Sequence, residues 1–363
     1  MTDHIAEHTV PLGSSSSQLL VGRGSSRALM ERLADEAPRF LVVSDHNVME
    51  AWAETLFPGP TWLSVPAGEA SKSVERLQEL WSSMLGRGLD RSSGLLAVGG
   101  GVVGDLAGFA AATYMRGIKF YSVPTSLLAM VDASVGGKVG IDLPEGKNLV
   151  GQFYPARVVA VDPELLATLP DSEWACGMAE VIKHAMLSGA PLWEELQSFT
   201  PQNRADPAKL DSLVAMAVGV KVRVVTEDPY EKTGLRATLN LGHTYGHAIE
   251  WCADFSVSHG SAVALGLLAG LRLSREMGLL EQNFEESLTS LLRRWGLPVS
   301  LPTREMFRWE RVAEALARDK KNKDGKWCFV LPVRVGEVTT VYGPPRSLVE
   351  RAFESLFAVG SAV

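Results

Sequence analysis

Cysteine is scarce in this chain of 363 residues, which contains only Cys176, Cys252 and Cys328. Their low, odd number and wide separation predict no disulfide framework and indicate a reducing compartment, which we expect to be the cytoplasm. Long hydrophobic runs are lacking as well. The longest apolar stretch, 262–271, is too short to cross a bilayer, so we expect no membrane partner.

Excess positive charge is also missing. The formal net charge of −7 argues against a nucleic-acid partner, although local basic clusters can still bind a small anion. The first residues are polar and partly acidic, and they lack the basic-then-apolar order of a signal peptide. Apolar residues make up 46% and charged residues 21%, which is typical of a globular protein. The length predicts two domains.

The first half of the chain alternates short apolar runs with helical patterns. We interpret the runs as buried β-strands at 40–45, 94–98, 120–123 and 157–162. Residues 74–85 space their apolar side chains three and four apart, as an amphipathic helix does. Non-alternating strands separated by helices predict a parallel sheet covered on both faces. We therefore expect an α/β nucleotide-binding domain over residues 1–170, with ligands at the carboxyl ends of its strands.

A glycine run, 99–104, follows the second of these strands and precedes a helix that we expect to begin at Leu106. Such small residues let backbone amides approach a pyrophosphate at a helix N-terminus. The acid that usually follows about twenty residues later is missing, so an ordinary tight turn remains the alternative. Asp45, at the end of the preceding strand, is our candidate for holding the adenosine ribose instead.

Two stretches that combine glycine with lysine come next, at 136–138 and 145–151. Glycine beside lysine suits the close approach of backbone to an anion. We interpret both stretches as anion-binding loops; the alternative is that their lysines are ordinary surface charges.

From residue 171 the pattern becomes mainly helical. The predicted helices are 176–187, 210–225, 261–277, 284–295 and 310–318. Residues 327–331 and 338–342 predict a small β-hairpin. We therefore expect a second, mostly α-helical domain over residues 171–363.

Three of the seven histidines lie between Arg236 and Gly260. His243 and His247 are four residues apart and share one helix face, which favours pairing them on a metal. A catalytic zinc site needs a third protein ligand. Glu180 is our candidate, and a simple ion pair between Glu180 and Lys183 is the alternative.

Taken together, these motifs resemble the 3-dehydroquinate synthases of the sugar phosphate cyclase superfamily. The matching segments keep the family's order and are 68–73, 99–109, 123–138, 147–148, 179–183, 239–247 and 258–260. The resemblance implies NAD in the first domain and one divalent metal, zinc or cobalt, per subunit. It assigns the metal to Glu180, His243 and His259, so that His247 lies beside the substrate phosphate instead of on the metal.

The resemblance also assigns residues to the cofactor. The implied NAD contacts are Asp45, Glu69, Lys72, Gly99, Gly100, Gly101, Val102, Asp105, Thr125, Ser126, Asp132, Lys138, Lys147 and Thr168.

A second implied set contacts the substrate, a small sugar acid phosphate. Its members are Arg116, Asp132, Lys138, Asn148, Lys183, Lys221, Arg236, Asn240, His247 and Lys321, with Lys320 as the alternative to Lys321. Arg116 would come from the partner subunit of a homodimer. The chain departs from the family at Lys232, where an acid is usual four residues before the arginine, and Glu231 stands one position earlier.

The implied reaction converts 3-deoxy-D-arabino-heptulosonate 7-phosphate into 3-dehydroquinate and phosphate. It proceeds through transient oxidation by NAD, β-elimination, reduction and intramolecular aldol closure. One alternative is a related sugar phosphate cyclase of the amino-dehydroquinate or cyclitol type, although valiolone synthases differ at the positions of Asn240 and His247. The other is a glycerol dehydrogenase-like oxidoreductase, which would release NADH and needs fewer phosphate-binding cations.

Overall fold

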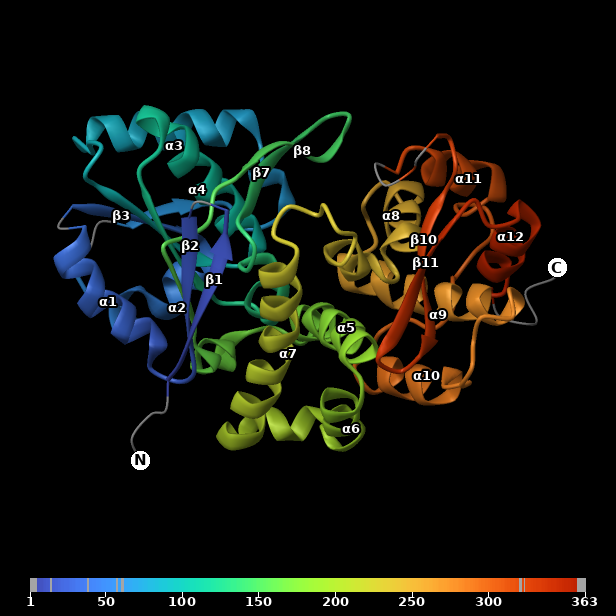
Figure 1. Ribbon diagram of the computed structural model, residues 1–363. Helices are drawn as coiled ribbons and strands as arrows, with labels where there is room; N and C mark the ends of the chain where they lie inside the picture. Colours follow the sequence, from blue (N-terminus) through green and yellow to red (C-terminus); the bar gives the residue numbers. More distant parts are fainter. Residues whose placement is uncertain are drawn as a thin grey trace. The chain divides into compact units, whose positions relative to one another are not determined.

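The computed structural model describes residues 5–13, 15–37, 39–56, 58–59, 62–319, 322 and 324–357. The chain divides into two compact units, labelled by element in Figure 1. The first comprises Met1–Pro170 with Lys221–Tyr230, and the second comprises Asp171–Val220 with Glu231–Val363. The segment 221–230 thus groups with the first unit, although the predicted limits place it in the second domain. Within the described residues, no helix has the length and apolar character needed to cross a membrane.

A seven-stranded sheet forms the core of the first unit, in the order β1-β2-β9-β6-β5-β3-β4. Its strands are β1 (Ala6–Leu12), β2 (Ser15–Val21), β3 (Phe40–Asp45), β4 (Trp62–Val65), β5 (Gly94–Gly99), β6 (Lys119–Pro124) and β9 (Val158–Val161). Every pairing is parallel except that of β1 with β2. The predicted parallel sheet and its four strands are confirmed, with ends that differ by no more than one residue.

Four helices cover this sheet: α1 (Ser25–Glu36), α2 (His46–Leu56), α3 (Val74–Gly86) and α4 (Gly101–Thr113). The chain moves outward along the sheet through β3 to β4 and then returns to β5 and β6. Right-handed crossovers therefore place α1 and α2 on one face and α3 and α4 on the other, and Figure 1 shows α1 and α3 on opposite sides of the strands. The carboxyl ends of β3 and β5 meet beside this reversal, where ligands bind in open α/β sheets.

The glycine run itself forms the first turn of α4. The helix begins at Gly101 and not at Leu106, because the amide of Gly104 already donates to the carbonyl of Gly100 at 3.1 Å. The predicted helix over 74–85 is confirmed by α3. The sequence did not reveal β1, β2, β4, α1 or α2, whose apolar patterns are short or interrupted by exposed residues.

The interpretation of 136–138 and 145–151 as loops is correct for Gly136, Gly137 and Glu145 but wrong for Lys138 and residues 146–151, which belong to strands. Lys138 begins β7 (Lys138–Leu143), which pairs antiparallel with β8 (Gly146–Phe153). Gly140 and Gly151 lie opposite each other in this hairpin, and a Cβ on Gly151 would lie 2.3 Å from the Val139 carbonyl oxygen. These two glycines therefore allow close approach of the strands. Side chains on β8 are mostly exposed, so the strand carries no apolar alternation that would have revealed it.

Helices dominate the second unit. They are α5 (Asp171–Ser188), α6 (Ala190–Ser198), α8 (His243–Cys252), α9 (His259–Glu276), α10 (Glu285–Arg294), α11 (Trp309–Ala317) and α12 (Arg346–Glu354). The long helix α7 (Pro207–Glu227) begins in this unit, and its final residues belong to the first. The predicted helices are confirmed, and so is the hairpin, formed by β10 (Cys328–Arg334) and β11 (Glu337–Tyr342).

Short helical turns complete the chain. The 3-10 turns are η1 (Glu69–Ser71), η2 (Tyr114–Arg116), η4 (Pro163–Thr168), η5 (Pro201–Ala205) and η6 (Arg236–Asn240), and η3 (Ala129–Ala133) is a π-helical turn.

Two glycines in α9 let the backbone of this helix pack directly against α5 and against the residue just before α8. A Cβ on Gly266 would lie 1.9 Å from the Gly242 carbonyl oxygen just before α8, and one on Gly260 would lie 2.4 Å from the Cα of Cys176 in α5. No side chain fits at such separations. The first residues of α8 and α9 and the middle of α5 are thereby held close together.

We predict that Gly266→Ala lowers the free energy of unfolding by about 1–3 kcal/mol or more, because the methyl group must push the helices apart. Gly219→Ala in α7 is the matched control, because nothing lies within 4 Å of its added Cβ. That change should raise stability by about 0.5–1 kcal/mol, the usual gain when alanine replaces a helical glycine. Urea unfolding of both variants measures the difference, and equal stabilities would contradict the packing described.

Candidate active site

Three side chains of the kind that bind metals converge in the second unit. Glu180 lies in the middle of α5, and His243 and His259 are the first residues of α8 and α9. One ligand atom from each lies within 4.8 Å of the others. Glu180 Oε1 is 3.5 Å from His243 Nε2 and 3.3 Å from His259 Nε2. Two imidazoles and one carboxylate form a donor set typical of catalytic zinc.

The other nitrogen of each imidazole is also held. His243 Nδ1 lies 3.1 Å from the carbonyl oxygen of Leu241, and His259 Nδ1 lies 3.5 Å from Glu250 Oε1. An acceptor beside Nδ1 favours a proton there and leaves the Nε2 lone pair for a metal. Glu250 is buried, and the sequence reasoning missed it. Its position seven residues after His243 on α8, two helical turns along the same face, could have identified it.

Electrostatics in this group favour a cation. Glu180 is fully buried; its Oε2 forms an ion pair with Lys183, and its Oε1 faces both imidazoles. Burial alone would raise the pKa of Glu180, but its ion pair with Lys183 and the two histidines hold that pKa well below its ordinary value. An anionic oxygen that faces two imidazole nitrogens in a buried position fits a divalent metal.

His243 and His259 have pKa values shifted in opposite directions. Burial lowers the pKa of His243 well below its ordinary value, so this imidazole is neutral and able to bind a metal. At His259 burial also opposes the charge, but Glu180 and Glu250 outweigh it and raise the pKa to about 10. In the metal-free protein a proton on His259 therefore partly balances Glu180 and Glu250, and a metal ion must displace it.

His247 lies one helical turn beyond His243, as the sequence predicted, and their ring centroids are 5.4 Å apart. Among the described residues, the group of ligand atoms contains Glu180, His243 and His259 but not His247. The helix face suggested that His243 and His247 share a metal. The ligand atoms instead converge from His243, Glu180 and His259.

Arg236 and Asn240 begin and end η6, also in the second unit. The Arg236 side chain is only 2% exposed, and its Nε lies 3.8 Å from Glu231 Oε1. Glu231 has a positive φ of 57°, a conformation that is uncommon for a residue other than glycine. An acid thus stands beside Arg236 even though Lys232 occupies the position where the family usually has it. Asn240 Nδ2 donates to the carbonyl oxygen of Ala237 at 3.0 Å.

Several predicted cofactor residues meet at the carboxyl ends of strands in the first unit. The amide of Thr125, just after β6, donates to the carbonyl oxygen of Gly99 at 3.0 Å, which ties two strand ends together. Asp45, at the end of β3, accepts from the backbone amides of Asn47 and Val48 and so caps α2. Ser126 lies beside the glycine turn, since a Cβ on Gly100 would lie 3.5 Å from its Oγ. Val102 belongs to the first turn of α4.

Thr168 ends η4, and its hydroxyl accepts from the Trp52 indole at 2.9 Å.

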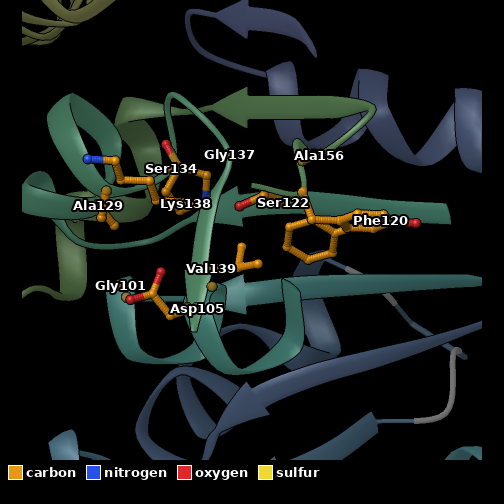
Figure 2. Close-up of a pocket in the computed structure, with 16 residues that line it drawn as sticks. Gly101, Asp105, Phe120, Ser122, Ala129, Ser134, Gly137, Lys138, Val139 and Ala156 are labelled. Atoms are coloured by element: carbon orange, nitrogen blue, oxygen red, sulfur yellow. The ribbon is translucent and has the colours of Figure 1, made fainter. Parts of the chain in front are cut away.

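A cavity opens beside the glycine turn, between α4, β6 and β7 (Figure 2). Five of the residues predicted to contact the cofactor line it: Gly99, Gly100, Gly101, Asp105 and Lys138. Figure 2 shows Asp105 on α4 and Lys138 at the start of β7 at this cavity. Ser122, Ser134 and Tyr154 add polar atoms to an otherwise largely apolar lining. The sequence reasoning did not identify these last three residues.

Lys72 is the centre of a charged network. Its side chain is 4% exposed, and Nζ lies 2.9 Å from Asp105 Oδ2 and 3.3 Å from Glu69 Oε1. Nζ also donates to Asn148 Oδ1. Burial opposes the charge, but Asp105 and Glu69 outweigh it and raise the pKa of Lys72. Asp142, which the sequence reasoning did not single out, lies 3.8 Å from the same Nζ.

The carboxyl groups of this network respond differently to burial. Burial raises the pKa of Asp105 to about 6, against the pull of Lys72. At Glu69 burial also acts to raise the pKa, but Lys72 and Lys147 hold it below its ordinary value.

Asp132, in the turn η3, forms an ion pair with Lys221. Both residues belong to the first unit, because Lys221 begins the segment of α7 that groups with it. Arg116 ends the turn η2 and is exposed, with a positive φ of 70°. Lys320 and Lys321 lie outside the described residues.

Comparison with known proteins gives two adjacent family matches. Residues 62–176 match 3-dehydroquinate synthase N-terminal and residues 177–322 match 3-dehydroquinate synthase C-terminal. A 3-dehydroquinate synthase from Symbiobacterium thermophilum is 44% identical over 339 residues, covering 90% of this chain and 94% of that protein. One from Synechocystis is 39% identical, covering 91% and 94%.

Solved structures share the fold. A 2-epi-5-epi-valiolone synthase from Streptomyces hygroscopicus, with NAD+ and Zn2+ bound, has a TM-score of 0.84 at 27% identity, covering 96% of this chain and 99% of that one. A 2-deoxy-scyllo-inosose synthase complexed with carbaglucose-6-phosphate, NAD+ and Co2+ also has a TM-score of 0.84, at 24% identity, with 97% and 100% covered. A probable glycerol dehydrogenase from Sinorhizobium meliloti reaches 0.59 at 19% identity, with 94% and 96% covered.

The matches run through both halves of the chain and include the segments that carry the glycine turn, Glu180, His243 and His259. The cyclases align more closely with this fold than the dehydrogenase does. The chain belongs to the 3-dehydroquinate synthase family.

Proposed function

We propose that this protein converts 3-deoxy-D-arabino-heptulosonate 7-phosphate into 3-dehydroquinate and inorganic phosphate, a step of the shikimate pathway to aromatic amino acids. The observation that carries this function is the 44% identity to a 3-dehydroquinate synthase over 90% of the chain. The family matches extend across both halves of the chain and agree with the proposal. In this proposal residues 1–170 form the NAD-binding domain and residues 171–363 the metal- and substrate-binding domain.

The metal ligands in the proposal are Glu180, His243 and His259. Their support is the convergence of one ligand atom from each within 4.8 Å, together with the burial of the Glu180 carboxylate, whose Oε1 faces both imidazoles. A divalent metal held there supplies a Lewis acid that lowers the pKa of a bound hydroxyl, and NAD supplies a reversible hydride acceptor. Lys183, in its ion pair with Glu180, keeps that carboxylate ionised for the metal.

The NAD site in the proposal lies at the carboxyl edge of the first unit's sheet. Its proposed contacts are Asp45, Glu69, Lys72, Gly99, Gly100, Gly101, Val102, Asp105, Thr125, Ser126, Asp132, Lys138, Lys147 and Thr168. The cavity beside the glycine turn supports this placement, because a pyrophosphate needs backbone amides at a helix N-terminus and α4 begins there. Only Gly100 separates the end of β5 from the start of α4.

Substrate binding requires cations, because a phosphate dianion and a carboxylate must both be neutralised. Lys138, Lys183, Lys221, Arg236 and Lys321 are the proposed set, with Asp132, Asn148, Asn240 and His247 as polar contacts. Buried, paired cations bind anions through short, charge-assisted hydrogen bonds. The buried Arg236 beside Glu231 and the Lys221–Asp132 pair support these roles, since both cations are already held in place.

A homodimer completes the proposal, with Arg116 entering the partner's site. Two features support an interface in this part of the chain. Met115 and Arg116 both have positive φ, and such strain tends to occur where a residue has a function. Leu149, Val150 and Phe153 on β8 are large apolar side chains that are 38–42% exposed. We also propose a cytoplasmic location, in keeping with three cysteines that are all free.

NAD should act catalytically, because the oxidation and the reduction of one turnover cancel. We expect phosphate to be released from the heptulosonate phosphate over many turnovers with NAD below the substrate concentration, and without a lasting rise in NADH absorbance. Phosphate assay and absorbance at the NADH band, recorded on one sample with zinc added, test this. One NADH accumulating per turnover would contradict the synthase and favour the dehydrogenase alternative.

The two histidines on α8 should behave differently towards metal. His243→Ala leaves only Glu180 and His259, so metal content after dialysis should fall sharply. His247→Ala keeps the three converging ligands and should retain close to one equivalent of metal per subunit, while its turnover falls by about 10–100-fold.

Metal analysis of both purified variants makes this comparison, and circular dichroism checks that each is folded. If His247→Ala loses its metal while His243→Ala keeps it, the ligand assignment is wrong.

A further inference from the structure

Asp142 contacts Lys72 through both its backbone and its side chain, and it also binds the backbone of Asn148. It lies on β7, and its own backbone amide donates to the carbonyl oxygen of Lys72 at 2.8 Å. Its Oδ1 accepts from the backbone amide of Asn148 at 2.7 Å and lies 3.8 Å from Lys72 Nζ. Asp142 is therefore joined both to the segment after η1 and to the facing strand β8.

Asn148 has an unusual backbone for a residue within a strand. Its φ is +52°, in the left-handed region, whereas its neighbours in β8 are extended. Asparagine tolerates this region better than most residues, but the conformation persists only where the surroundings impose it. The hydrogen bond from Asn148 N–H to Asp142 fixes this backbone, and the Asn148 side chain then accepts from Lys72 Nζ.

Lys72 links Asn148 to α4, the helix that begins with the glycine turn. Its buried ammonium pairs with Asp105 on α4 at 2.9 Å and with Glu69 at 3.3 Å. A lysine has three donors, so the directions of Asp105, Glu69 and Asn148 must agree with one another. We expect loss of the Asp142 carboxylate to remove the acceptor of the Asn148 amide and to let Lys72 shift towards Asp105 and Glu69.

We propose that Asp142 is a positioning residue for the reaction, because it holds Asn148 and Lys72 in the one arrangement that aligns a substrate contact with the NAD site. This inference rests on the proposed function. It adds to that function a residue that touches neither substrate nor cofactor in the proposal and acts through the backbone of Asn148.

Three variants separate this role from a merely structural one. Asp142→Ala removes the acceptor of the Asn148 amide, so kcat should fall by about 100-fold, the loss expected when a reacting group is misplaced by about an ångström. Asp142→Asn keeps an oxygen at the same position and should recover most of the parent's kcat. Glu145→Ala removes an exposed carboxylate from the turn of the same hairpin and should leave kcat unchanged. If Asp142→Ala does not fold, Asp142→Ser replaces it.

A double-mutant cycle tests the path through Asn148. Glycine adopts positive φ without support. In an Asn148→Gly background, Asp142→Ala should therefore cost far less than it does in the parent. Dissociation constants for NAD, measured by titration without substrate, should rise in Asp142→Ala and remain near the parent value in Asp142→Asn.

Each outcome bears on the inference. An Asp142→Ala variant that keeps the parent's kcat and NAD affinity overturns it. So does an Asp142→Asn variant as impaired as Asp142→Ala, because the negative charge and not the hydrogen bond would then matter, and so does additivity in the cycle. If the parent itself releases no phosphate from the heptulosonate phosphate, the proposed function has failed. The NAD titration then still decides whether Asp142 positions Lys72.

Discussion

The candidate metal site depends on how closely the backbone of α9 packs against its neighbours. Glycine at 260 and 266 lets α9 approach α5 and the start of α8 at distances that exclude any side chain. That approach brings Glu180, His243 and His259 within reach of a single ion. A three-ligand site tolerates little displacement, so the packing that stabilises the second unit also sets the geometry of the chemistry.

The proposed binding sites are rich in positively charged side chains, although the molecule as a whole is negatively charged. The chain as a whole is acidic, with a formal net charge of −7, yet the groups proposed to bind an anionic substrate are lysines and arginines. Lys183 and Lys221, and also Lys72 at the proposed NAD site, are each buried beside a carboxylate that holds the lysine in place. A cation whose position is already fixed loses less conformational freedom when a ligand binds. The acids are therefore part of the binding machinery even where they repel the substrate.

Much of this could be predicted from the sequence, and the limits have physical reasons. The central strands β3, β5, β6 and β9 are mostly apolar because both of their faces are buried, so they were easy to identify. The hairpin β7–β8 was mistaken for loops because most of its outer strand is exposed and its glycines serve strand contact.

The ligand set illustrates the same limit at the scale of a site. Helical spacing placed His243 beside His247, but the geometry joins His243 to two residues that are distant along the chain. Spacing reports neighbours within one helix and contains no information about which helices meet. Residue chemistry already offered Glu180 as a ligand, and the resemblance added His259. Neither argument singled out Glu250 or Asp142, which act on other residues.

The most direct test of the account is X-ray absorption at the zinc edge on the purified, zinc-loaded protein. The account predicts a first shell of nitrogen and oxygen only, with multiple scattering from two imidazoles. Sulfur should be absent, because no cysteine among the described residues belongs to the group of converging ligand atoms formed by Glu180, His243 and His259. A spectrum that requires a sulfur ligand, or three imidazoles, would contradict the site formed by Glu180, His243 and His259.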